Sequence, residues 1–324
     1  MEIRKIRNLA ALCLIAIALV ISSCGKQEKK SIDENALSGT INISGAFALY
    51  PMTVAWADSF MKLNPDVRIN ISAGGAGKGM TDALTGLVDI GMFSRGISDE
   101  EKAKGAFHVA VTRDAVLPVV SANNPVLKQL LEQGLKKQDF INIFLDNKTE
   151  TWGELCKVNN NNKVIVYTRS DACGAAEMWG KYLGKDQESL IGTGVFGDPG
   201  IAEAVKKDIN GIGYNNVIYV YDSKTRKPYQ GLEIIPLDLN ENGKIDSDEN
   251  FYQSMDSIMK AITLNKYPSP PARDLYFITN GKPSNQLVIE FIKWILTSGQ
   301  AMVEQAGYVN LTQKQIDAEL TKLQ

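Results

Sequence analysis

The chain has 324 residues, of which 44% are hydrophobic and 22% are charged. This composition is typical of a folded protein with one large domain or two ordinary ones, and it excludes a chain dominated by low-complexity sequence. The formal net charge is −2 at pH 7 and the basic residues are not clustered, which excludes a broad electrostatic surface for nucleic acid.

The N-terminus has the pattern of a secretory signal. Basic residues precede an apolar run over residues 9–21, which is too short to span a bilayer comfortably. The run ends in ISSC, which resembles the lipobox of bacterial lipoproteins, so we expect cleavage after residue 23 and a lipid on Cys24. The alternative is an ordinary signal peptide with an incidental cysteine. Removing residues 1–23 changes the formal charge from −2 to −4, because three basic residues and one acidic residue are lost. Residues 24–38 are polar and predict a flexible tether.

Four cysteines occur in the sequence. Cys13 belongs to the signal and Cys24 would carry the lipid. Cys156 and Cys173 would remain in an oxidising compartment, where a pair of cysteines can form a disulfide. The sequence leaves this bond open, because it does not give the distance between the two Cα atoms.

Strand and helix patterns alternate from Thr40 onward. In the first part of the chain we expect strands at 40–44, 67–72 and 88–93, and helices at 51–63 and 80–87. Units of strand, loop, helix and strand predict a mainly parallel sheet with helices on both faces. Ligands of such sheets bind beyond the carboxyl ends of the strands, at helix N-termini.

The chain then changes domain twice. The extended segment 115–121 predicts the first crossing, and the YPSPP motif at 267–271 predicts a stiff return crossing. Between the crossings we expect strands at 163–167, 211–221 and 232–237, and helices at 173–183, 199–207 and 251–264. After them we expect a strand at 274–279, a long helix at 286–305 and a C-terminal helix from 312. The sequence therefore predicts two Rossmann-like α/β lobes, 39–116 with 272–324 and 117–271, hinged about a cleft.

Several segments together resemble the phosphate-binding family of periplasmic solute-binding proteins. The similar segments are 45–51, the glycine loop 74–79, VDIGMFSR at 88–95, YTRSDACG at 167–174, 202–214, ARDLY at 272–276 and FIKWILTS at 291–298. Their order and spacing carry the resemblance, which covers roughly residues 38–311. It implies a type II fold of two lobes joined by two short segments. It also implies reversible capture of phosphate and delivery to an ABC permease, by a protein that is not an enzyme.

Physical chemistry independently favours an anion site. A helix N-terminus leaves N–H groups unpaired and carries about half a positive charge. Turns at 47–51, 75–80 and 172–177 would direct three such termini into one cleft. Arg169 could give two parallel hydrogen bonds to an oxyanion, with Arg95 as a second candidate. The alternative for Arg169 is an ion pair with Asp171 or another acid.

The expected ligand-binding residues depart from the family pattern. They are Phe47, Ala48, Gly75, Ala76, Gly77, Ser94, Arg95, Arg169, Cys173, Gly174 and Ala175. The family lines its cleft with hydroxyls at these loops, whereas this chain keeps one only at Ser94 among the matched positions. Each lost hydrogen bond to a charged ligand is worth about 1.5–3 kcal/mol. Phosphate or a related oxyanion is the expected ligand, and a less polar ligand or a role outside uptake is the alternative.

A nucleotide-binding interpretation of the glycine loop fails. A P-loop needs a glycine five residues before its Gly-Lys pair and a Ser or Thr after it. Around Lys78 those positions are Ser72 and Gly79.

Residues 238–249 fit the twelve-residue calcium loop of EF-hands. The expected ligands are Asp238, Asn240, Asn242, the backbone carbonyl of Lys244, Asp246 either directly or through water, and a bidentate Glu249. Gly243 would permit the sharp turn. A strand pattern precedes the loop, so we expect a solitary structural Ca²⁺ site and not a sensor. The alternative is an acidic turn without metal.

Two other classes of function compete with transport. A cysteine hydrolase could use Cys173, but its base would have to be His108, which lies in the other expected lobe. A binding lipoprotein of the same fold could also signal or adhere instead of feeding a transporter. In either role we expect a monomer anchored at the periplasmic or cell-surface face of the membrane. A permease and ATPase encoded beside it would favour transport.

Overall fold

The structure is a computed structural model that describes residues 36–324, within which Leu37–Gln324 form one compact unit. The expected signal peptide, Cys24 and the tether up to residue 35 lie outside the described residues. Within residues 36–324, none of the helices has both the length and the apolar character needed to traverse a bilayer.

The first lobe is built on three parallel strands with helices on both sides. Its N-terminal elements are β1 (Gly39–Gly45), α2 (Tyr50–Leu63), β2 (Val67–Ala73), α3 (Ala76–Leu84), β3 (Ile90–Phe93) and α4 (Asp99–Ala103). Strand β1 pairs in parallel with β2 and β3. The helices α12 (Gln286–Leu296), η2 (Ser298–Met302) and α13 (Gln313–Lys322) complete this lobe. Its core includes the fully buried Trp56, Phe277 and Phe291.

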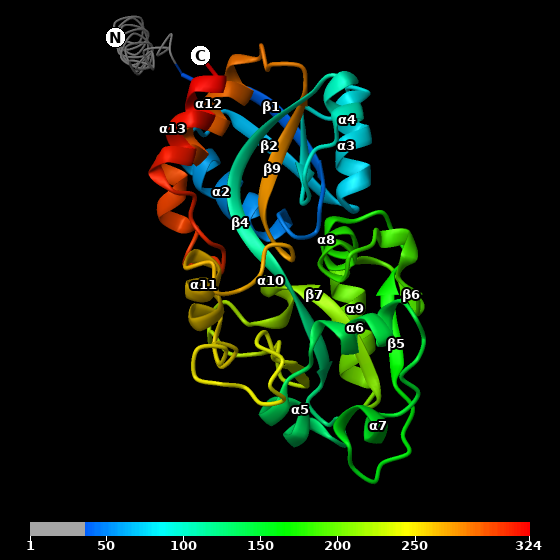
Figure 1. Cartoon of the computed structure of the whole chain (residues 1–324). Coiled ribbons are helices and arrows are strands. Elements are labelled where there is room, and N and C mark those ends of the chain that lie inside the picture. Colours follow the sequence, from blue (N-terminus) through cyan, green and yellow to red (C-terminus); the bar gives the residue numbers. More distant parts are fainter. Residues whose placement is uncertain (1–35) are drawn as a thin grey trace, which may run out of the picture. The chain divides into compact units, whose positions relative to one another are not determined.

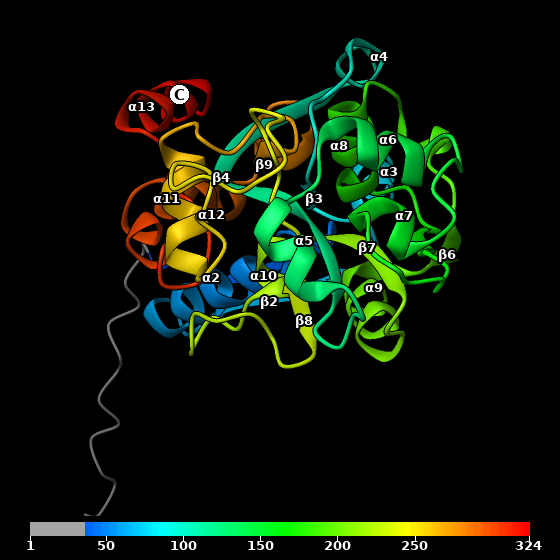
Figure 2. The ribbon, with the colours of Figure 1, turned by 60° about the horizontal axis from the view of Figure 1, so that its bottom comes forward.

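The second lobe has its own core. Its elements are α5 (Leu127–Gln133), α6 (Lys137–Phe144), α7 (Trp152–Cys156), β5 (Ile165–Arg169), α8 (Gly174–Leu183), η1 (Gln187–Ser189), β6 (Thr193–Val195), α9 (Gly197–Lys207), β7 (Gly211–Asn216), α10 (Val217–Val220), β8 (Leu232–Ile234) and α11 (Met255–Thr263). Strand β5 pairs in parallel with β6 and β7. Helices α8 and α9 lie on either side of β7 (Figure 2). Aromatic rings around Trp179 fill the centre of this core.

Two long strands pass between the lobes (Figure 1). The first half of β4 (Ala106–Ser121) pairs antiparallel with β9 (Ala272–Asn280), and its second half pairs with β7 and β8. The first core extends along these strands as far as Val111, and the second begins at Ala115. The predicted fold class, two α/β lobes joined by two crossings, is confirmed.

Helix α3 contacts the backbone of the sheet directly. A Cβ on Gly79 would lie 2.4 Å from the Met92 carbonyl oxygen, and a Cβ on Gly91 would lie 2.2 Å from that of Gly79. Only glycine permits such an approach. The glycine loop is thus largely the first turns of α3, which begins at Ala76, whereas we expected a helix from residue 80.

Two other element predictions were wrong in part. The expected strand 211–221 ends at Asn216 and continues as the short helix α10. The expected helix 286–305 ends at Leu296, and a 3-10 turn follows. The buried amide of Gln300 donates to the carbonyl oxygens of Ile295 and Val111, so a side chain replaces the next turn of helix.

Candidate functional site

The expected ligand-binding turns meet where the two lobes touch. The Gly77 N–H donates to the Ala172 carbonyl oxygen at 3.1 Å, which joins the start of α3 to the turn before α8. A Cβ on Gly174 would lie 2.1 Å from the Ser94 carbonyl oxygen. The Tyr219 hydroxyl donates to the Phe47 carbonyl oxygen at 3.0 Å. The three helix starts singled out from the sequence therefore converge on one place.

These turns carry backbone donors without acceptors. Within residues 36–324, no hydrogen-bond partner exists for the N–H groups of Phe47, Ala48, Ala76, Gly174 and Ala175. The side chains of these residues are short or apolar, and the three alanines are at most 2% exposed. Buried N–H groups in native proteins are almost always paired. Such a set of unpaired donors at helix starts is suited to an anionic acceptor.

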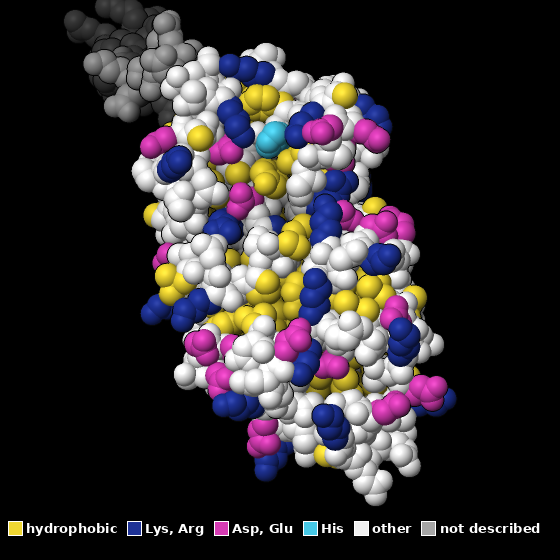
Figure 3. Space-filling view, in the orientation of Figure 1, with side chains coloured by type: hydrophobic (Ala, Val, Ile, Leu, Met, Phe, Trp, Pro, Cys, Tyr) yellow, Lys and Arg dark blue, Asp and Glu magenta, His cyan; other side chains and the backbone are white. Residues whose placement is uncertain are grey.

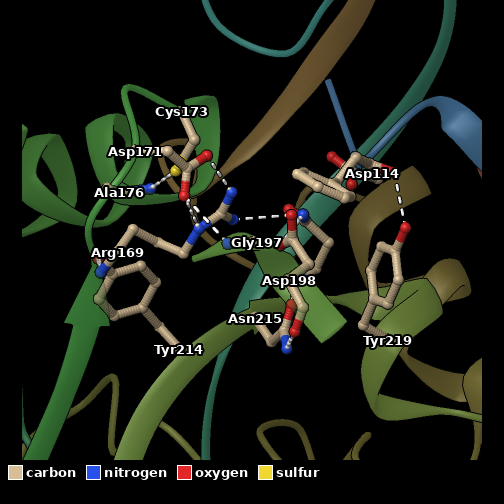
Figure 4. A network of polar contacts seen from close by, with 12 residues as sticks. Asp114, Arg169, Asp171, Cys173, Ala176, Gly197, Asp198, Tyr214, Asn215 and Tyr219 are labelled. Carbon is tan, nitrogen blue, oxygen red and sulfur yellow. Dashed lines mark hydrogen bonds and ion pairs between the residues drawn. The ribbon is translucent and has the colours of Figure 1, made fainter. Parts of the chain in front are cut away.

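Arg169 lies beside the turns and is held by two acids (Figure 4). Its Nε donates to Asp171 Oδ1 at 2.8 Å, and its Nη1 donates to Asp198 Oδ2 at 2.7 Å. A third bond joins Nη2 to the second Asp171 oxygen. Burial alone would lower the pKa of Arg169, but the carboxylates, Asp198 foremost, raise it above its usual value. The ion pair with Asp171, weighed as the alternative for this residue, is present. Two guanidinium N–H groups remain for another acceptor.

A buried polar chain continues from Asp198 to the crossing strands. Asp198 Oδ1 accepts from the Asn216 amide, whose oxygen accepts from Arg273. Arg273 Nε lies 3.2 Å from Asp114 Oδ1. Sequence reasoning missed Asp198, Asp114 and Arg273. The matched ARDLY motif contained Arg273, but no sequence signal paired it with an acid 159 positions away.

Cys173 has a structural role at the start of α8. Its Sγ accepts from the Ala176 N–H at 3.4 Å, and burial raises the pKa of its thiol to about 12. The thiol is therefore protonated, which is the wrong state for a nucleophile. Cys156 and Cys173 are both free, so the disulfide left open by the sequence is not formed. His108 packs against Tyr276 in the first lobe.

Arg95 is engaged away from the meeting turns. Its guanidinium pairs with Glu101 at 2.7 Å and lies 4.5 Å from the centre of the Phe93 ring. Ser94, the preceding residue, is 2% exposed and lies against Gly174. The structure thus places Ser94 among the converging turns and directs Arg95 toward α4.

The exterior is mixed in charge. On the face shown in Figure 3, acidic and basic side chains are interspersed, with apolar side chains between them. The surface on this side therefore presents no extended field of one sign.

Comparisons with known proteins agree with this architecture. The chain is 28% identical over 230 residues to the phosphate-binding protein PstS of Bacillus subtilis, an alignment covering 68% of this chain and 74% of that protein. It is 26% identical to PstS of Methanocaldococcus jannaschii, with 93% and 90% covered.

Solved structures show the same fold. A phosphate ABC transporter substrate-binding protein of Clostridium perfringens with bound phosphate superposes with a TM-score of 0.68 at 23% identity, covering 85% of this chain and all of that one. An ABC-type phosphate transport receptor of Vibrio cholerae gives 0.60 at 17% identity, covering 84% and 100%. Residues 32–298 match the family model described as the PBP superfamily domain. Because that match spans most of the chain, the protein belongs to the PBP superfamily.

Proposed function

We propose that this protein is an extracytoplasmic lipoprotein that captures phosphate, or a related small oxyanion, between its lobes and delivers it to an ABC permease. The observation that carries the proposal is the convergence of unpaired backbone N–H groups from three helix starts. The names of the relatives support phosphate as the ligand. The signal and lipobox patterns support the anchor and its location.

Main-chain donors can compensate for the missing hydroxyls. Each hydrogen bond to a charged partner contributes about 1.5–3 kcal/mol, so five N–H groups can offset the side chains that this cleft lacks. Arg169 is already paired with Asp171 and Asp198, so it fixes the ligand through its two remaining N–H groups more than through net charge. The chemistry is reversible binding, and no step requires a nucleophile.

Calorimetric titration of ligand-free protein with phosphate tests the proposal. We expect one site per chain with a dissociation constant below about 10 μM. Sulfate, titrated in parallel, has a similar shape without a titratable proton at neutral pH and serves as the comparison. Absence of both heat and thermal shift at millimolar phosphate would exclude phosphate as the ligand.

A binding lipoprotein of the same fold with another ligand is the second candidate. The observation that favours it is the apolar lining, with Phe47 and three alanines at the turns where the family carries hydroxyls. A screen of small organic acids for thermal stabilisation separates the candidates. Stabilisation by one of these acids without any by phosphate would select this alternative.

A further inference from the structure

The loop between β8 and α11 carries a pattern that anion capture does not use. Residues 238–249 place oxygen-bearing residues at the six ligand positions of an EF-hand loop. This loop contains five acidic residues and one lysine, and it lies in the second lobe. The expected turn is present, since Gly243 has φ +82°, a conformation that favours glycine.

The first and last positions of the pattern fold back over the loop. Asp238 accepts from the N–H groups of Asn242 and Gly243 at 3.1 and 2.8 Å. Glu249 Oε1 accepts from the N–H groups of Leu239 and Asn240 at 2.8 and 2.9 Å. Residues eleven positions apart are thereby held at the same end of the loop.

These two carboxylates are buried without a compensating cation. Asp238 is 3% exposed and Glu249 is 4% exposed. Within residues 36–324 neither forms an ion pair, and the one lysine of the loop pairs with Asp246 at its surface, at 2.8 Å. Buried charges in proteins are normally paired or bound to a metal ion. Backbone N–H groups satisfy the oxygens of both carboxylates, with the Asp246 N–H donating to Glu249 Oε2 at 3.2 Å, but no cationic side chain of residues 36–324 balances their charge, and this supports the cation that the sequence pattern predicts.

We propose that residues 238–249 bind one calcium ion. The ligands are carboxylate oxygens of Asp238, Asp246 and Glu249, amide oxygens of Asn240 and Asn242, and the Lys244 carbonyl. Only three of these six ligands are acidic side chains. Within residues 36–324 no compact group of three His, Cys, Asp or Glu side chains occurs, so the carboxylates of Asp238, Asp246 and Glu249 have to close around the ion as it binds. Calcium accepts such a flexible set of oxygens more readily than magnesium, which demands an octahedron.

The ion would fasten the loop to the segment that joins α5 to α6. The Asp238 N–H donates to the Leu135 carbonyl oxygen at 3.0 Å, and the Ile245 N–H donates to that of Glu132 at 2.9 Å. The Ile245 side chain also packs against Gly134. Calcium that holds both ends of the loop therefore stabilises the second lobe.

Calcium titration of protein stripped with a chelator tests the site. We expect one bound ion with a dissociation constant of about 0.1–1 mM, as in extracellular calcium modules. At saturating calcium the unfolding midpoint should rise by roughly 5 °C. Magnesium at the same concentration should produce a much smaller shift. If calcium gives neither a heat of binding nor a shift of the unfolding midpoint in the wild-type protein, the proposal is overturned.

Matched variants identify the ligands. Glu249→Gln and Asp246→Asn should each weaken calcium binding at least tenfold. Because the Asp246 side chain is partly exposed, the fold should tolerate its substitution. Asp248→Asn lies in the same loop at an exposed, non-ligand position and should bind as the wild type does. Lys244→Ala should retain calcium, because the carbonyl binds the ion and the ammonium competes for Asp246. Equal affinity of the wild type and Glu249→Gln would refute the assignment.

Phosphate binding is measured in the same samples with and without chelator. The calcium proposal does not depend on the ligand of the cleft, so calcium binding by a protein that ignores phosphate would still support it.

Discussion

At Gly174 the backbones of the two lobes approach each other closely. It begins α8 in the second lobe, and a Cβ there would lie 2.1 Å from the carbonyl oxygen of Ser94 and 2.3 Å from its Oγ. The carbonyl oxygen belongs to the backbone and cannot turn aside as the end of a side chain can. A side chain at position 174 therefore has to push the lobes apart.

Gly174→Ala is expected to weaken phosphate binding at least tenfold, which is about 1.4 kcal/mol. The added methyl prevents the turns from meeting, while the ligand-free stability should change little, because alanine favours the helix that begins here. Calorimetry and denaturant unfolding measure the two effects. Gly96→Ala is the control, since no atom lies within 4 Å of its Cβ position. Equal phosphate affinity in both variants would contradict this role for Gly174.

The candidate site could be predicted as a set of turns but not as a set of contacts. Turns that precede helices follow from local patterns, so the turns 47–51, 75–80 and 172–177 were accessible from sequence, although α3 begins at Ala76 and not at residue 80. The pairing of Arg169 with Asp198 could not be predicted from sequence, because this contact joins β5 to the start of α9 across 29 positions. Which acid a buried arginine selects depends on tertiary packing, and a single sequence has no signal for it.

At the scale of elements, the crossing of β4 and β9 contains a buried contact between an acid and an arginine. Asp114 and Arg273 face each other in the strand register, and their side chains are 2% and 3% exposed. Burial raises the pKa of Asp114 to about 7, although Arg273 opposes this shift. The pair lies between the ends of the two cores, where the chain passes from one lobe to the other.

The raised pKa predicts a pH dependence of stability. Between about pH 4 and pH 7 the folded protein holds a proton on Asp114 that the unfolded chain has released, so this group's contribution to stability decreases as pH rises. Asp114→Asn should flatten that slope. Denaturant unfolding of both proteins at pH 5 and pH 7.5 gives the difference. A variant with the same slope as the wild type would show that Asp114 does not titrate in this range.

Element prediction succeeded where hydrophobic periodicity was unambiguous. Strand β2 and helix α2 lie within a residue of their expected bounds. It failed at 74–79, because glycine usually marks a loop, whereas here it lets α3 pack on the sheet backbone. It failed also at Thr297, where Gln300 ends α12 by a contact that no local pattern encodes.

At the scale of the molecule, Phe47 and Tyr219 connect the lobes. The Tyr219 hydroxyl donates to the Phe47 carbonyl oxygen, and the Phe47 ring packs edge-on against Phe196 at 5.7 Å between ring centres. The same ring lies 5.7 Å from the Arg169 guanidinium carbon. These contacts stabilise the arrangement in which the turns meet.

Tyr219→Phe removes one hydrogen bond between the lobes and should weaken phosphate binding by about 2- to 12-fold, equivalent to 0.5–1.5 kcal/mol. The loss should appear mainly as faster ligand release, measured by stopped-flow competition. Tyr229→Phe removes an exposed hydroxyl without a hydrogen-bond partner in residues 36–324 and is the control. If phosphate leaves Tyr219→Phe as slowly as it leaves the wild type, the hydrogen bond from Tyr219 to Phe47 does not help to hold the lobes together around the ligand.

The pairing of Arg169 with two acids has a consequence for how an ion finds the crevice. Arg169 together with Asp171 and Asp198 carries one positive and two negative formal charges, a net charge of −1, so this cluster does not attract anions over a long range, and peptide dipoles act only over a few ångströms. An approaching anion is therefore not drawn in from afar. It arrives by diffusion and is recognised only after it has shed its hydration shell between the turns, so added salt should not slow its capture.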